Sequence, residues 1–147
     1  MQKSLSLIND ISQVTVLAEW VSLMGKELFL PMHTIFQLNL ALEEAVVNVM
    51  NYAYPGKKGQ YVTLTAKTVK NIDGSEHIIF VLKDNGIPFD PTQAPKPDTT
   101  LTAEKRNIGG LGIFLVQHLM ESVTYERREE NNILTMKYRL PQNTPML

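Results

Sequence analysis

The chain has 147 residues, of which 44% are hydrophobic and 20% are charged, a composition typical of a globular domain and not of a disordered chain. Fourteen basic and 15 acidic residues leave a formal net charge of −1, so no basic excess points to nucleic acid or to an anionic membrane surface. Cysteine is absent, which excludes disulfides and thiolate metal sites, and the three histidines have no metal-ligand spacing.

The first part of the chain predicts one strand and two helices. Residues 3–8 alternate polar and apolar side chains, as a short strand does. Apolar residues then recur at helical spacing, which predicts a helix over about residues 11–29. A second helix is predicted over about 31–54, since a proline suits its first position and a Pro-Gly pair follows its end.

The rest of the chain predicts two hairpins and a third helix. Residues 60–70 alternate as a strand does, residues 76–84 are richer in the residue types of a buried strand, and the turn sequence NIDGS lies between them. Residues 85–108 lack apolar periodicity and predict a long loop, which in a compact domain is uncommon unless it is functional or disordered. A glycine-rich turn then opens a helix within 107–120, and residues 122–140 indicate another hairpin.

This order of elements predicts an α+β fold. We expect a two-layer sandwich in which a mixed, mostly antiparallel sheet carries its helices on one face. The sequence shows no internal repeat, so we expect a single domain over residues 1–147. No run approaches the roughly 18 apolar residues of a membrane span, and the N-terminus lacks the apolar core of a signal peptide. We therefore expect a cytoplasmic protein with neither a membrane nor a nucleic acid as partner.

The first candidate site is the polar edge of the second predicted helix, in the sequence LEEAVVNVMNYAYPG. Glu44 and Asn48 are four residues apart, so they lie on one edge of that helix. Such a pair is ordinarily a solvated edge beside the core. Alternatively, the Asn48 oxygen suits Mg²⁺, and Glu44 can accept a proton from a nucleophile that attacks a phosphate. Glu43 points about 100° away and does not stack over Asn48, which favours Glu44 as the base.

The second candidate site is the sequence DNGIPFDP, residues 84–91. Its residue types favour a β-turn, which is the plain interpretation. However, Asp84 comes at the end of an apolar strand, and Gly86 permits close approach. The carboxylate could therefore accept a hydrogen bond from an exocyclic amine such as that of adenine. Asp90 is interpreted as serving the turn.

The third candidate site is NIGGLGIFLVQHLM, residues 107–120. Glycines at a helix start expose backbone N–H groups, and the helix dipole adds partial positive charge, so a phosphate can bind there without a lysine. Glycines also serve plain tight turns, and neither the Walker nor the Rossmann pattern is matched. The order of the three sites is more informative than any one of them, because each supplies a different part of a Mg²⁺-ATP site.

In this order the three sites resemble the motifs of the GHKL ATPase superfamily. Within it, the chain is similar to the anti-sigma-factor serine kinases of bacterial partner-switching modules, from about residue 40 to residue 120. The resemblance implies the ATPase type of two-layer sandwich, with Glu44 as general base and Asn48 as Mg²⁺ ligand. Tyr52 stands where many of these kinases have a histidine.

The resemblance also implies contacts with ATP. Asp84 would bind the adenine amine, Gly86 would shape the pocket, and Thr135 on the last strand would lie near it. Residues 91–108 would form a lid over ATP, from which Arg106 would reach the phosphate tail. The expected phosphate contacts on the glycine-rich segment are Gly110, Leu111 and Gly112.

The function implied by this resemblance is that of a Mg²⁺-ATP-dependent protein serine/threonine kinase that acts as an anti-sigma factor. Its expected partners are a small phosphoacceptor protein, which is the anti-sigma-factor antagonist, and a sigma factor or other regulatory client. A homodimer is also expected. Two alternatives remain open at this point: an ATP-binding module that holds a client without significant phosphotransfer, and a simple ATPase in which Glu44 activates water.

Overall fold

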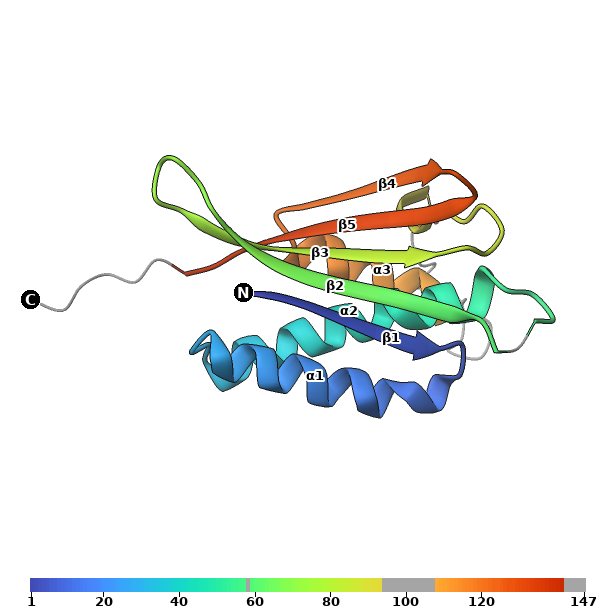
Figure 1. Cartoon of the computed structure of the whole chain (residues 1–147), viewed down its shortest axis with the longest axis horizontal. Coiled ribbons are helices and arrows are strands. Elements are labelled where there is room, and N and C mark those ends of the chain that lie inside the picture. Colours follow the sequence, from blue (N-terminus) through green and yellow to red (C-terminus); the bar gives the residue numbers. More distant parts are fainter. Residues whose placement is uncertain (58, 94–107, 142–147) are drawn as a thin grey trace, which may run out of the picture.

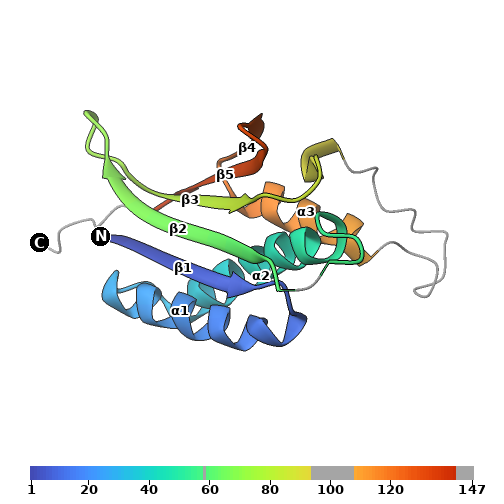
Figure 2. The same cartoon turned by 45° about the vertical axis from the view of Figure 1, so that its right-hand side comes forward.

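The protein is represented by a computed structural model, which describes residues 1–57, 59–93 and 108–141, with only the course of the backbone for 108–112. Over these residues, three α-helices lie on one face of a five-stranded sheet (Figures 1 and 2). No helix in the described part of the chain has the length and apolar character needed to cross a membrane. The elements are β1 Gln2–Ile8, η1 Ile11–Gln13, α1 Val14–Glu27, α2 Met32–Tyr52, β2 Tyr61–Lys70, β3 Glu76–Asp84, η2 Pro91–Gln93, α3 Ile108–Leu119, β4 Ser122–Arg128 and β5 Asn131–Arg139.

The sheet has the strand order β1-β2-β3-β5-β4, and each neighbouring pair is antiparallel. The predicted two-layer α+β fold is therefore confirmed. A mixed sheet was expected, yet none of the pairings among the described strands is parallel. The reason is that β5 lies between β3 and β4. The chain passes from β3 through α3 to β4 at the sheet edge, so β3 and β4 do not pair with each other.

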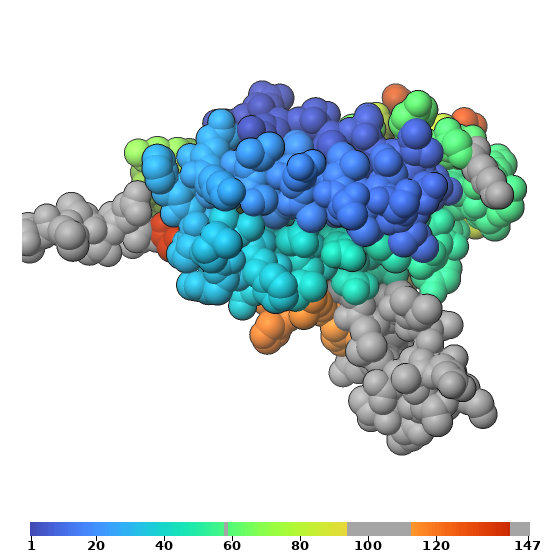
Figure 3. Space-filling model, turned by 90° about the horizontal axis from the view of Figure 1, so that it is seen from below, coloured from blue at the N-terminus to red at the C-terminus, as the bar shows by residue number. Residues whose placement is uncertain are grey.

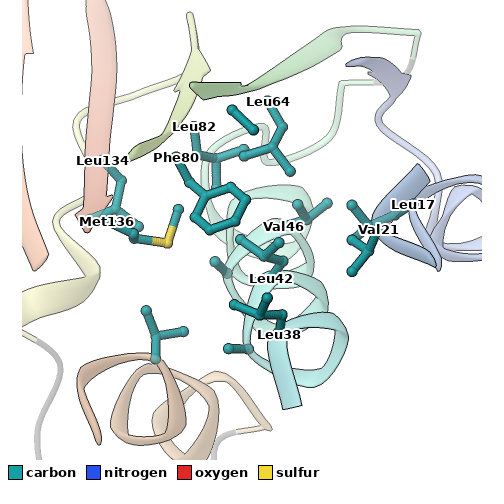
Figure 4. Packing of buried hydrophobic residues seen from close by; sticks show 14 of the residues in the cluster. Leu17, Val21, Leu38, Leu42, Val46, Leu64, Phe80, Leu82, Leu134 and Met136 are labelled. Atoms are coloured by element: carbon teal, nitrogen blue, oxygen red, sulfur yellow. The ribbon is translucent and has the colours of Figure 1, made fainter. Parts of the chain in front are cut away.

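The core lies between the sheet and the helices, and α2 runs through its centre (Figure 4). Alternate residues of the strands point to the helices, as the period of two requires. Each fully buried large apolar side chain contributes about 1.5–3 kcal/mol of transfer free energy. The residues at the centre include Leu38, Leu42 and Val46 of α2, Phe80 and Leu82 of β3, and Leu134 and Met136 of β5.

Helix α1 packs closely against α2 at Gly25. A Cβ atom at Gly25 would lie 2.4 Å from Ile35 Cγ1 and 2.7 Å from Ile35 Cδ1, which is closer than such atoms approach. The absence of a side chain at Gly25 thus sets the spacing of the two helices. Helix α3 packs on the other flank of α2, so that α2 lies between its two neighbours (Figure 2).

The three candidate segments meet at one end of this sandwich. Strand β3 ends there at Asp84, and the loop after it reaches the C-terminal end of α2 through a hydrogen bond from Ile87 N to Ala53 O. Strand β4 starts at the opposite end, because Ser122 pairs with Lys137. Helix α3 leads into β4, so its N-terminal end lies beside the C-terminal end of α2 (Figure 2).

We predict that Gly25→Ala lowers the free energy of unfolding by about 1–3 kcal/mol, the usual cost of overpacking, although alanine favours a helix. The physical reason is the collision with Ile35. Urea denaturation of the single variants and of Gly25→Ala/Ile35→Ala measures it, and the double variant should lose less than the sum of the two singles. A Gly25→Ala protein as stable as the parent would contradict this account of the helix spacing.

Candidate functional site

The site is organised around Asp84, whose carboxylate is buried at the end of β3. Its Oδ1 atom accepts hydrogen bonds from Asn132 Nδ2 at 2.8 Å and from the backbone N–H of Gly86 at 2.9 Å. Burial raises the pKa of Asp84, while these two hydrogen bonds and the charge of Arg127 act in the opposite direction. The carboxylate is thus desolvated but held in one orientation.

Asn132 is a site residue that the sequence analysis missed. It lies opposite Asp84 in the β3–β5 pairing and is buried. Besides Asp84, its Nδ2 atom donates to Ile87 O at 2.7 Å, and its Oδ1 atom accepts from Phe89 N at 3.2 Å. One carboxamide therefore holds both the carboxylate and the loop that follows it. The sequence does carry a signal for this residue. Asn132 precedes Leu134 by two positions and Met136 by four, so it is a polar residue on the buried face of a strand.

Strand β4, at the edge of the sheet, contributes two side chains that donate hydrogen bonds to Asn132. Tyr125 donates its hydroxyl hydrogen to Asn132 Oδ1 at 2.5 Å, and Arg127 Nη1 donates to the same oxygen at 3.2 Å. Arg127 Nη1 also donates to Gly86 O at 2.8 Å. Both hydrogen-bonding ends of the Asn132 carboxamide are thus satisfied, as a buried amide requires.

The structure does not bring Thr135 to this site. Thr135 pairs with Val81 of β3 and Thr124 of β4, and it alternates with the buried residues of β5. Its side chain therefore projects from the sheet face opposite the helices. The expectation that Thr135 lies near the pocket is corrected, because register places Asn132 beside Asp84 instead.

Gly86 lies against the C-terminal end of α2. A Cβ atom at Gly86 would be 2.2 Å from the carbonyl oxygen of Ala53, so only glycine fits there. The neighbouring Ile87 N donates to that oxygen at 2.8 Å. Tyr54 fixes the same loop: its hydroxyl donates to Asn85 Oδ1 at 2.8 Å and accepts from Asn85 N at 2.9 Å. The second candidate segment is thus fastened to the first.

The polar edge of α2 faces this end of the molecule. Asn48 is only 2% exposed, and its Nδ2 atom has no hydrogen-bond partner in the described part of the chain. Ile35 faces α1, and Asn48 lies about 140° further round the axis of α2. Asn48 is therefore on the side of α2 that packs against α3. Glu44, one turn earlier, is half-buried, and burial followed by the charge of Glu43 raises its pKa.

An aromatic contact occupies the end of this edge. The ring of Tyr52, at the last residue of α2, packs on the ring of Phe89 with centroids 5.4 Å apart and planes tilted by 32°. Nearby, Asp90 Oδ1 accepts hydrogen bonds from the N–H and the hydroxyl of Thr92. Asp90 thus has the turn role that its sequence context predicted.

The glycine-rich segment forms the first turns of α3 and is not a turn before it. Helix α3 begins at Ile108, so Gly110, Leu111 and Gly112 are all helical. The N–H groups of the first three helical residues have no partner within the helix, and these include Gly110 but neither Leu111 nor Gly112. Arg106 and residues 94–107 of the expected lid lie outside the described residues.

The donor set fits a metal ion that takes few protein ligands. In the described ranges, no three His, Cys, Asp or Glu side chains group together. Mg²⁺ usually binds through one or two protein oxygens, with water and phosphate completing its shell. The buried Asn48 carboxamide fits such a role through its neutral oxygen, Oδ1, which is the kind of ligand that Mg²⁺ takes.

The sequence resembles those of known proteins. Residues 8–138 match the family described as the histidine kinase-like ATPase domain. The chain is 33% identical over 101 residues to the serine/threonine-protein kinase BtrW of Bordetella bronchiseptica, covering 69% of this chain and 68% of that protein. It is 29% identical over 108 residues to the serine-protein kinase RsbW of Listeria monocytogenes, covering 71% of this chain and 66% of that protein.

A third relative, the serine-protein kinase RsbW of Staphylococcus epidermidis, is 32% identical over 104 residues, covering 67% of this chain and 62% of that protein. The matched region spans about two thirds of the length of these relatives. The family match covers both the helix that carries Glu44 and Asn48 and the strand end that carries Asp84. The chain belongs to the histidine kinase-like ATPase family.

Proposed function

We propose that the chain is a Mg²⁺- and ATP-dependent protein serine/threonine kinase that acts as an anti-sigma factor in a partner-switching module. It phosphorylates a small antagonist protein, and in its other state it holds a sigma factor or similar client. The relatives named as serine-protein kinases support the activity. The observation that carries the proposal is half-buried Glu44, one helical turn from buried Asn48, at the end of the sheet where Asp84 lies.

The adenine of ATP would bind at Asp84. The two hydrogen bonds that the structure gives this carboxylate both go to Oδ1, which leaves Oδ2 to accept from the exocyclic amine. Asn132 and Gly86 fix the orientation of the carboxylate. The N-terminal turn of α3, at the same end of the sandwich, would supply backbone N–H groups to the phosphates.

The metal would be held by Asn48. Bound Mg²⁺ neutralises the charge of the phosphates and orients them. Asn48 Oδ1 would be its protein ligand, and burial on the α3 flank keeps the carboxamide from turning into solvent. The Asn48 Nδ2 atom, which has no hydrogen-bond partner among the described residues, would remain free to donate to a phosphate oxygen.

Glu44 would act as the general base. The acceptor hydroxyl oxygen of a serine or threonine attacks the γ-phosphorus, its proton passes to a Glu44 carboxylate oxygen, and ADP leaves. Burial and Glu43 raise the pKa of Glu44, which makes its carboxylate a better proton acceptor. A module that only bound ATP would not need a carboxylate here, which disfavours the binding-module alternative.

We predict that Glu44→Ala keeps Mg²⁺-ATP affinity but loses phosphotransfer by at least about 100-fold, the range for a general base. Asn48→Ala should instead lose Mg²⁺-ATP affinity. Calorimetric titration measures binding, and intact mass measures phosphate gain by the small proteins encoded beside the gene. Glu43→Ala is the matched control and should retain the transfer rate at saturating acceptor. Full transfer by Glu44→Ala would contradict the base assignment, and phosphate release without an acceptor would indicate a simple ATPase.

We predict that the transfer rate falls as pH is lowered, because protonated Glu44 cannot accept the hydroxyl proton. Since its pKa is raised, the fall should begin at a higher pH than for an ordinary glutamate. Glu43→Gln removes a like charge and should move the midpoint to lower pH. Rates at saturating ATP and acceptor measure the profile, and an identical midpoint in Glu43→Gln would argue against Glu44 as the titrating group.

We predict that base recognition depends on the Asp84–Asn132 pair. The parent should bind ATP about tenfold or more tightly than purine riboside triphosphate, which lacks the exocyclic amine, because a hydrogen bond to a carboxylate contributes about 1.5–3 kcal/mol. Asp84→Asn should abolish this preference, since one amide end must accept from Asn132 and the other then presents N–H groups. Asn132→Leu should reduce it. Equal loss of both affinities in Asn132→Leu would indicate a purely structural role.

A further inference from the structure

One ridge of α2 runs from solvent into the proposed catalytic site. Met32, Phe36, Leu40, Glu44 and Asn48 recur every four residues, so their side chains form a continuous ridge on the helix. Each step advances about 40° round the axis. The first three are 73%, 64% and 36% exposed, Glu44 is half-buried and Asn48 is buried. The ridge therefore turns from the outer surface into the flank that faces α3.

The outer surface on which the ridge begins is formed by helices. Figure 3 shows this face, with α1 in blue and α2 in cyan side by side at the surface. The apolar side chains on α2 are not isolated, because Met32, Phe36 and Leu40 succeed one another at the four-residue spacing of neighbours on a helix. A contiguous exposed apolar row of this kind marks an interaction surface more often than scattered residues do.

Phe29, in the loop before α2, adds a second and independent observation. Helix α1 ends in a Schellman motif, in which Phe29 N donates to Lys26 O and Leu30 N donates to Gly25 O. The position that Phe29 occupies has φ of 56°, where glycine is strongly preferred and a bulky residue is strained. The side chain of Phe29 is also 92% exposed. Both the strain and the exposure are costs that no contact within the described chain offsets.

The charges of α2 indicate what could cover this row. The helix contains no lysine or arginine, and its acidic residues, Glu43 and Glu44, lie three and four residues after Leu40, within one helical turn. A partner that matches this order presents apolar side chains and then a basic residue. The twelve steps along the chain from Met32 to Glu44 rise about 18 Å along the axis. The partner segment must therefore bridge that length.

We propose that the phosphoacceptor protein docks on the exposed apolar surface formed by Phe29 and by the first three residues of the ridge, Met32, Phe36 and Leu40. The proposal rests on the proposed kinase function. The acceptor lays apolar side chains on the ridge, places a lysine or arginine against Glu43, and so brings its serine or threonine hydroxyl to Glu44. The acceptor is the occupant that continuity favours, because the ridge leads to the carboxylate that must meet the acceptor hydroxyl.

The first test measures acceptor kinetics with Phe36→Ser. The probe is the small protein that gains a phosphate from the parent chain and Mg²⁺-ATP. We expect the KM for this acceptor to rise about tenfold or more, as for a central apolar anchor, while the KM for ATP and the rate at saturating acceptor stay unchanged. Ile72→Ser is the matched control, since Ile72 is an even more exposed apolar residue and lies on the β2–β3 turn.

The second test uses Phe29→Gly, for which docking and stability should change in opposite directions. Glycine relieves the strain at positive φ, so the denaturation midpoint should rise. The KM for the acceptor should rise as well, because the aromatic anchor is lost. A structural role for Phe29 predicts the reverse: a lower midpoint with unchanged acceptor kinetics.

The outcomes separate this proposal from the proposed function. If the parent chain phosphorylates none of the acceptors, the kinase proposal fails and the assigned occupant fails with it. If the parent transfers phosphate and Phe36→Ser keeps the parental KM for the acceptor, the docking proposal alone is overturned. A sedimentation change of the chain alone in Phe36→Ser would assign the ridge to a second copy, and would also overturn the proposal.

Discussion

The carbonyl oxygen of Ala53, at the C-terminal end of α2, accepts a hydrogen bond from Ile87 and leaves no room for a side chain at Gly86. This contact joins the helix that carries Glu44 and Asn48 to the strand end that carries Asp84. Tyr54 reinforces it through its two hydrogen bonds with Asn85. Because two backbones meet here with no side chain between them, the distance between the two halves of the site cannot vary by a rotamer change.

The second constraint is the buried polar network around Asn132. A buried carboxylate is costly unless its hydrogen bonds are made, and an amide with one unmade bond would add to that cost. Asn132 satisfies Asp84 and the following loop with one end and receives Tyr125 and Arg127 with the other. Strand β4, at the edge of the sheet, thus contributes to the site through residues that lie nowhere near Asp84 in the sequence.

Helix α2 combines three tasks because a helix has several faces. Its inner face, with Leu38 and Leu42, builds the centre of the core, and its α3 flank buries Asn48. Its outer face carries the exposed row that ends at Glu44. A rotation of α2 by one residue, about 100°, would move all three sets together, so core packing also sets the orientation of the proposed base.

The sequence by itself determined the strands, the helices and the two-layer class, because periods of 2 and 3.6 are local properties of the chain. It also singled out Asp84 and Gly86, since a carboxylate at the end of an apolar strand and a glycine in a turn are visible locally. Only the tertiary structure decided that Asn132, and not Thr135, lies beside Asp84, because a strand's register decides which residue faces its neighbour. It likewise showed why Gly86 must be glycine, since the colliding atom belongs to Ala53, 33 residues earlier in the chain. Contacts between distant segments depend on how helices and strands pack, and no periodicity within one segment contains that information.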